Sequence, residues 1–202
     1  MFLVPLLEQG LPIEGFDASP FMLDRLRKKC GAKNIKPAIW EGRLEEMDQQ
    51  DQYALIFIAS ASFGLIIDLE NVKKCIEKIY RALHSGGKFV FDIQTLQAIP
   101  QQLNIWKGNL RYYIDGRKIL LSTLDLPLEE NIGTTLCRYD LIDGNDIIKT
   151  EIENFRIRLH DPYELAYLLK EIGFKNIKPM QPFNYNKKPG KNDEIVIFEC
   201  QK

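Results

Sequence analysis

Buried strands alternate with amphipathic helices over the first half of the chain. Tyr53–Ala59 is almost wholly apolar, as a strand covered on both faces must be. The next helix places Val72, Ile76 and Ile79 on one side and charged residues on the other, and Lys88–Ile93 is another buried strand. Strands that alternate with helices form βαβ units. The pattern therefore predicts an α/β fold with a doubly wound, mostly parallel sheet.

One strand ends at an acidic residue that has a candidate function. Ile13 and Phe16 predict a short buried strand that stops at Asp17, and Ser19 with Pro20 predicts the start of a helix. A carboxylate at the carboxyl end of such a strand can accept hydrogen bonds from both ribose hydroxyls of a nucleotide. The alternative is that Asp17 only helps to cap the helix.

The hydrophobic pattern changes after Thr95. Two Asp-Gly pairs, Asp115-Gly116 and Asp143-Gly144, each separate two strand-like runs, which is typical of β-hairpins. We therefore expect residues 96–160 to form an inserted antiparallel meander. A helix from Asp161 and a final antiparallel hairpin complete the chain. With no repeat and no linker, we expect one domain over residues 1–202.

Composition narrows the possible partners. Hydrophobic residues make up 45% and charged residues 27%, and Lys plus Arg (27) balance Asp plus Glu (28). Neither nucleic acid nor a membrane is therefore expected as a partner. No apolar run approaches the roughly 18 residues of a membrane span, so we expect a cytoplasmic protein. No metal site is expected, because the cysteines lack metal-ligand spacing; they are Cys30, Cys75, Cys137 and Cys200.

Taken in order, these elements resemble the class I S-adenosylmethionine-dependent methyltransferases of the small-molecule type. The matching pieces are Ile13–Leu23, Tyr53–Ala59, Ala82–Asp92 and Glu164–Phe174. The meander at 96–160 resembles the lid that small-molecule members carry after the fifth strand. The resemblance implies S-adenosylmethionine as cofactor and a small molecule as methyl acceptor.

The resemblance also implies contacts for the nucleoside part of the cofactor. Asp17 would hold the ribose hydroxyls, and Ala18 and Met22 would lie against the adenine. Arg43 and Leu44 stand where this fold contacts the adenine edge; many members have an acid at the Arg43 position, so that contact can come from the backbone alone. Core packing is the alternative for Met22 and Leu44.

Other residues would face the methionine end and the acceptor. Ala59 and Ser60, just beyond a strand, would line the methionine end. Methyl transfer needs little acid–base help, so the sequence names no catalytic residue. His160 is the candidate if a base is used, although a lone histidine near a strand end is more often a surface histidine or one whose hydrogen bonds are satisfied. The candidate substrate residues, which could hold an acidic substrate or merely solvate an exposed sheet, are Tyr112, Tyr139, Arg156 and Arg158.

One departure from the family concerns the first, central strand and its glycine-rich loop, which should precede Phe2. Three explanations stay open: the chain is a fragment, another subunit (for example in a homodimer) covers the gap, or the neighbouring strands close up. We expect these 202 residues to bind the cofactor poorly. The alternatives are a catalytically silent methyltransferase-like module that binds a partner, and a nicotinamide-dependent oxidoreductase.

Overall fold

The computed structural model describes residues 2–113 and 115–202. The chain forms two compact units, Met1–Gln49 and Gln50–Lys202. The single domain expected from the sequence stays a prediction. No helix in the described part is both long enough and apolar enough to cross a membrane.

The first unit is a small α/β layer. Its strands β1 and β2 pair in parallel, from Glu14 opposite Ala38 to Asp17 opposite Glu41. Helix α2 contacts both strands and buries Leu23. In order, its elements are α1 (Leu3–Glu8), β1 (Glu14–Asp17), α2 (Pro20–Gly31), β2 (Ala38–Glu41) and the short 3-10 helix η1 (Leu44–Glu46). The predicted strand ending at Asp17 and the helix that follows it are confirmed.

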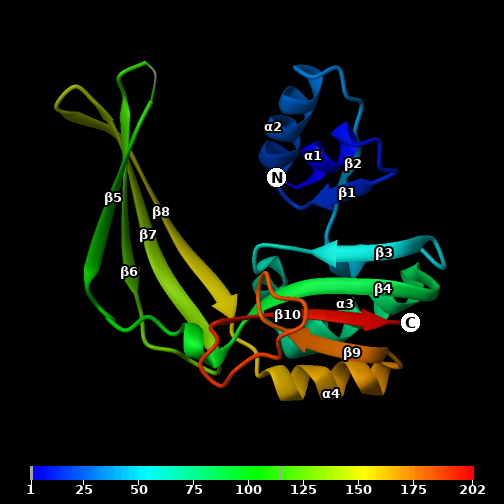
Figure 1. Cartoon of the computed structure of the whole chain (residues 1–202). Coiled ribbons are helices and arrows are strands. Elements are labelled where there is room, and N and C mark those ends of the chain that lie inside the picture. Colours follow the sequence, from blue (N-terminus) through cyan, green and yellow to red (C-terminus); the bar gives the residue numbers. More distant parts are fainter. Residues whose placement is uncertain (1, 114) are drawn as a thin grey trace. The chain divides into compact units, whose positions relative to one another are not determined.

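The second unit contains a four-stranded sheet in the order β3-β4-β10-β9 (Figure 1). The pair β3–β4 is parallel, whereas β4–β10 and β10–β9 are antiparallel. The α/β part of the chain is therefore mixed: both antiparallel pairings contain β10, a strand of the predicted C-terminal hairpin, which is confirmed together with the α/β class. The strands are β3 (Tyr53–Ile58), β4 (Leu83–Gln94), β9 (Lys175–Met180) and β10 (Ile195–Gln201).

Helices α3 (Leu69–Ala82) and α4 (Pro162–Ile172) pack against each other and against β4 and β9. Asp68 and Asp161 cap these helices by accepting backbone N–H groups, as expected of acidic residues at this position. Phenylalanine rings stack through the core, with Phe89 and Phe91 centroids 4.3 Å apart and Phe91 and Phe198 5.4 Å apart. The core thus lies between the sheet and the two helices.

The chain turns between α3 and the regular part of β4. The sequence predicts this turn at residues 85–87, and in the structure residues 84–87 bulge opposite Ala54 alone, because Leu83 pairs with Tyr53 and Lys88 with Leu55. A Cβ on Gly87 would lie 3.0 Å from both the His84 and the Tyr53 carbonyl oxygens. This close approach, together with the positive φ of Gly86, 78°, shows that both glycines suit the turn that leads into β4.

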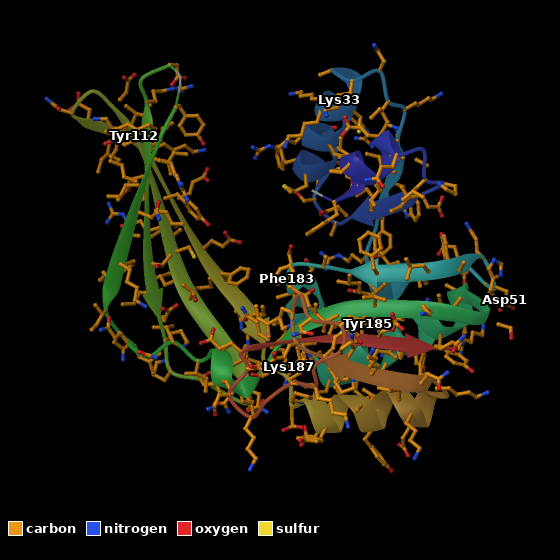
Figure 2. All side chains as sticks on the ribbon, in the orientation of Figure 1. Lys33, Asp51, Tyr112, Phe183, Tyr185 and Lys187 are labelled. Atoms are coloured by element: carbon orange, nitrogen blue, oxygen red, sulfur yellow. The ribbon has the colours of Figure 1, made fainter. Side chains whose placement is uncertain are left out.

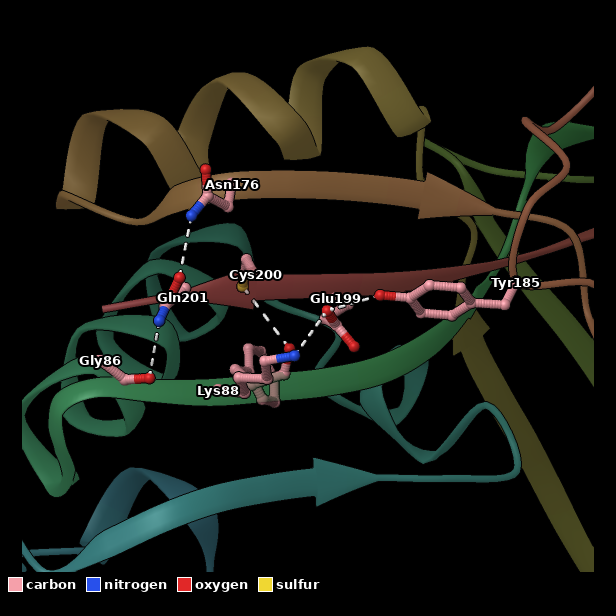
Figure 3. Close-up of polar contacts among 8 residues, drawn as sticks. Gly86, Lys88, Asn176, Tyr185, Glu199, Cys200 and Gln201 are labelled. Carbon is pink, nitrogen blue, oxygen red and sulfur yellow. Dashed lines mark hydrogen bonds and ion pairs between the residues drawn. The ribbon is translucent and has the colours of Figure 1, made fainter.

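Side-chain hydrogen bonds and an ion pair join β10 to the neighbouring strands β4 and β9 (Figure 3). The Gln201 side chain donates to the Gly86 carbonyl and accepts from the Asn176 amide, both at 2.9 Å. Glu199 pairs with Lys88 at 3.1 Å and accepts from the Tyr185 hydroxyl at 3.2 Å. The C-terminal strand is thus joined to both flanking segments by side chains as well as by backbone.

The meander forms a second sheet of four antiparallel strands in the order β5-β6-β7-β8 (Figure 1). Paired residues across it share a face, so Tyr139 lies on the same face as Thr135 and Phe155, whereas Tyr112 and Arg156 lie on the opposite face. The predicted hairpins are present, and the lid role stays a prediction. The strands are β5 (Trp106–Tyr112), β6 (Lys118–Asp125), β7 (Ile132–Asp143) and β8 (Asp146–Arg158).

Candidate functional site

Asp17 lies at the carboxyl end of β1. Its Oδ1 accepts the Ser19 N–H at 2.8 Å, and Ser19 Oγ accepts the Met22 N–H at 3.3 Å, which begins α2. The side chain is exposed, and Oδ2 has no hydrogen-bond partner among the described residues. One carboxylate oxygen therefore shapes the turn, as the capping alternative proposes. The other is available to a ligand.

The other predicted nucleoside contacts of the first unit lie near Asp17. Ala18 is exposed and Met22 is 48% exposed, so Met22 is not a core residue. Arg43 and Leu44 follow β2, whose last residue pairs with Asp17. Leu44 is half-buried, and the Arg43 N–H donates to Glu46 Oε2 at 3.1 Å. The structure thus brings these five residues to one edge of the two-stranded sheet, the edge where α/β folds bind ligands.

The loop after β3 contains Ala59 and Ser60. Ser60 and the next residue, Ala61, both have positive φ angles, 63° and 56°. The Ala61 N–H donates to Asp92 Oδ2 at 2.8 Å, while Asp92 Oδ1 is inaccessible to solvent and has no partner in the described part of the chain. Non-glycine residues at positive φ cost energy and persist where the surroundings hold them. Asp92 therefore holds this loop in place, a role that the sequence analysis missed. Its position at the end of Ala82–Asp92, a segment that resembles the methyltransferases, could have indicated this role.

The short helix η2 (Ser62–Leu65), which follows this loop, packs against the end of β8. A Cβ on Gly64 would lie 2.6 Å from Ile157 Cγ1 and 2.9 Å from the Arg158 carbonyl oxygen. The buried Arg158 side chain donates from Nε to the Ile67 carbonyl and from Nη1 to the Glu130 carbonyl, the latter at 3.1 Å. Arg158 thereby joins the loop after β3 to the β6–β7 turn.

His160 is buried at the junction of the meander and the central sheet. Its backbone N–H donates to the Gln94 carbonyl at 2.9 Å, and its ring lies 5.4 Å from the Phe63 ring. Burial, followed by the charge of Arg158, lowers the pKa of His160 to about 4. The imidazole is therefore neutral at pH 7, and its buried Nε2 has no hydrogen-bond partner among the described residues.

A cleft of about 190 Å³ lies at the carboxyl end of β4, under the base of the meander. Its walls are mainly apolar, and Asp125 is the one ionisable side chain among its described lining residues. The lining residues are Gln94, Ala98, Ile99, Pro100, Asp125, Leu126, Leu128, Gly133, Thr134, Thr135, Phe155, Ile157 and Leu159. Position and lining make this cleft the candidate acceptor site of the second unit.

A larger groove of about 470 Å³ lies between α3 and α4. It is lined mostly by charged and polar side chains, including Lys73, Glu77, Arg81 and Glu171. These residues belong to the later turns of helices that lead into the amino ends of β4 and β9. Because ligands of α/β folds bind at the opposite, carboxyl ends of the strands, we do not assign this groove to the site.

We compared the sequence and the structure with known proteins. Residues 2–87 match a protein-family model described as a methyltransferase domain, whereas no curated protein matches the chain. An S-adenosylmethionine-dependent methyltransferase from Clostridium acetobutylicum ATCC 824 is 20% identical, with a TM-score of 0.75 over 98% of this chain and 88% of that one. The sugar N-methyltransferase KedS8 from Streptoalloteichus sp ATCC 53650 is 13% identical, with a TM-score of 0.75 over 97% and 74%.

A third match is CalS10, an amino pentose methyltransferase from Micromonospora echinaspora with S-adenosylmethionine bound. It is 11% identical and has a TM-score of 0.71 over 98% of this chain and 77% of that one. The chain has the class I S-adenosylmethionine-dependent methyltransferase fold. The resemblance drawn from the sequence is thereby confirmed, and S-adenosylmethionine is the cofactor named for these structures.

On the methyltransferase fold, the predicted substrate residues lie at different places. Tyr139 is on the face of the meander that continues into the cleft, whereas Arg156 is on the opposite face. Tyr112 is 74% exposed at the tip of the β5–β6 hairpin, far along the ribbon from the cleft (Figure 2). The guanidinium of Arg158 is bonded to backbone carbonyls. Their roles toward a substrate stay predictions.

The sequence analysis did not identify Asp125, the acidic residue that lines the cleft under the meander. Asp125 Oδ1 accepts from the Thr135 hydroxyl at 2.8 Å, and its Oδ2 lies 3.1 Å from Lys107 Nζ. In the sequence it is one acid among many, and no motif marks it. The available signal was its position as the last residue of a strand of the methyltransferase fold's inserted meander. No group of three or more potential metal ligands occurs in the described part of the chain.

Proposed function

We propose that this chain catalyses methyl transfer from S-adenosylmethionine to a small-molecule acceptor. The observation that carries the proposal is the exposed carboxylate of Asp17 at the carboxyl end of β1, with Oδ2 unpartnered among the described residues. This oxygen fits a ribose diol, and when bound the cofactor supplies an already activated methyl group. The protein then has to hold and align two molecules, which requires no nucleophilic side chain.

The residues that would hold the cofactor follow strand ends. Asp17 would accept hydrogen bonds from the ribose, the residues around α2 and η1 would contact the adenine, and the loop after β3 would receive the methionine end. The proposed set is Asp17, Ala18, Met22, Arg43, Leu44, Ala59 and Ser60. His160 is neutral at pH 7 and buried, so we propose no acid–base role that requires it to reach solvent.

The cleft under the meander supports a small acceptor. Its volume of about 190 Å³ is below the roughly 300–1,000 Å³ of pockets for drug-sized ligands, so it suits a single ring or one part of a larger molecule. Two of the similar structures are described as methyltransferases of a sugar and of an amino pentose, which are acceptors of this size. Tyr139 lies on the sheet face that leads into the cleft.

We propose further that the isolated chain binds the cofactor weakly. In the described residues β1 pairs only with β2, and β3 only with β4, so each has one edge with unpaired backbone groups. Such edges favour the addition of another strand. A second copy in a homodimer would be one source of it. The same open edges favour the second candidate function, a catalytically silent module that binds a partner.

Isothermal titration with S-adenosylhomocysteine tests the proposal. We expect binding weaker than low-micromolar for the unaltered chain and at least tenfold weaker again for Asp17→Asn, because a hydrogen bond to a charged group contributes about 1.5–3 kcal/mol. The matched control is Asp24→Asn on the exposed side of α2, where Asp24 pairs with Arg27 at 2.8 Å. This variant should bind as the unaltered chain does.

The outcomes separate the candidate functions. Equal binding by the two variants would refute the role of Asp17, and no binding at millimolar ligand would favour the silent module. Low-micromolar affinity would refute the proposed weakness. Light scattering of the same samples reports whether a homodimer is present.

A further inference from the structure

Asp125 gives the cleft a negative charge at one end. Its side chain is 16% exposed, so its carboxylate is largely removed from water. Thr135 and Lys107 each contact one carboxylate oxygen, at 2.8 Å and 3.1 Å. A carboxylate offers about four lone-pair positions, so two contacts leave room for further donors.

The positive partner of this carboxylate is an exposed lysine. Lys107 is on β5, an edge strand of the meander, and its side chain is 46% exposed. A lysine ammonium on a flexible stem can stay in water when another cation takes its place. The remaining polar groups that line the cleft, Gln94, Thr134 and Thr135, are uncharged. A ligand in the cleft therefore meets a carboxylate and no fixed positive charge from the lining.

We propose that the cleft binds a small acceptor that carries an amine, whose ammonium group Asp125 anchors. The inference rests on the proposed function, because it names the substrate class of the same site. A protonated amine has no free electron pair, so the anchored group does not itself receive the methyl group. The nucleophile is a second group on the same molecule. Apolar walls such as Phe155 and Leu159 would enclose its carbon skeleton.

Three probes that share one ring and differ in charge test this: cyclohexylamine, cyclohexanol and cyclohexanecarboxylate. Each is titrated at pH 7 into the ¹⁵N-labelled full chain, with the amide signals of Thr134 and Thr135 as reporters of the cleft. We expect cyclohexylamine to bind at least tenfold more tightly than cyclohexanecarboxylate, with the alcohol between them. Equal binding of the three, preference for the carboxylate, or shifts confined to other residues would overturn the proposal.

Two variants with opposite expected effects on amine binding test whether Asp125 is the group that selects the amine. Asp125→Asn should abolish the preference for the amine, and Lys107→Met should strengthen amine binding several-fold, because it removes the competing cation. The control is Asp115→Asn at the β5–β6 turn, which changes the net charge equally and should keep the preference. If Asp125→Asn does not fold, the Lys107 variant alone decides; no gain in amine affinity there refutes the competition argument.

The test is independent of cofactor binding. Charge-selective binding by a chain that ignores S-adenosylhomocysteine would support the cation site and refute the methyltransferase proposal. The reverse result would refute only the inference about Asp125.

Discussion

Gly64 lies against the base of the meander, and Gly64→Ala tests whether that contact is as tight as the structure has it. An added Cβ would lie 2.6 Å from Ile157 Cγ1 and 2.9 Å from the Arg158 carbonyl oxygen. Atoms cannot approach so closely, and the Arg158 carbonyl is backbone that cannot rotate away. Overpacking of this kind costs about 1–3 kcal/mol, against a gain of up to about 1 kcal/mol from replacing a helical glycine.

We therefore expect Gly64→Ala to lower the free energy of unfolding by about 1–2 kcal/mol, measured from the urea midpoint at constant slope. Gly108→Ala is the matched control, because its Cβ would meet Leu120 Cδ1 at an ordinary 3.6 Å. That variant should be neutral or slightly more stable. A Gly64→Ala protein as stable as the control would refute the reasoning.

Two further predictions concern the same junction. Arg158→Met should lower the free energy of unfolding by about 2–4 kcal/mol, because the Ile67 and Glu130 carbonyls lose charged donors. In the same urea experiment, Arg158→Lys should recover only part of that loss. For His160, the folded-state pKa of about 4 is below the ordinary imidazole pKa of 6.5. The unfolded chain therefore binds more protons between these pH values, and stability falls as pH falls through that window. The loss should reach about 3 kcal/mol at pH 4, and His160→Phe should flatten the curve of unfolding free energy against pH over that range; an unchanged slope would contradict the burial argument.

Local signals in the sequence were sufficient for most of the elements. Ser19 and Pro20 marked the start of α2, and the Asp-Gly pairs at 115 and 143 marked two turns of the meander, because each of these residues has a strong intrinsic preference for its position. The turn from α3 into β4 was marked in the same way. Gly86 and Gly87 favour a turn, and residues 84–87 bulge from the pairing with β3 at that place.

The candidate site was predictable only where a residue's role follows from its place at a strand end. Asp17 is such a residue, and the structure places it with an exposed carboxylate oxygen. Asp125 depends instead on strand register, which decides that it lies beside Thr135 and on the face that leads into the cleft. A shift of one residue would move every side chain of that strand to the other face, and the sequence alone does not fix this register.

Arg158 does not contribute its charge to the cleft. The sequence left open whether this arginine holds an acidic substrate, whose carboxylate a guanidinium matches, or only solvates an exposed sheet. In the structure the turn at Glu130 and the loop at Ile67 each present a backbone carbonyl that accepts from this buried guanidinium. Buried carbonyls need hydrogen-bond donors, and the Arg158 guanidinium supplies them here. Asp125 is then the one ionisable side chain among the described residues that line the cleft, and on this the proposed selectivity for an amine depends.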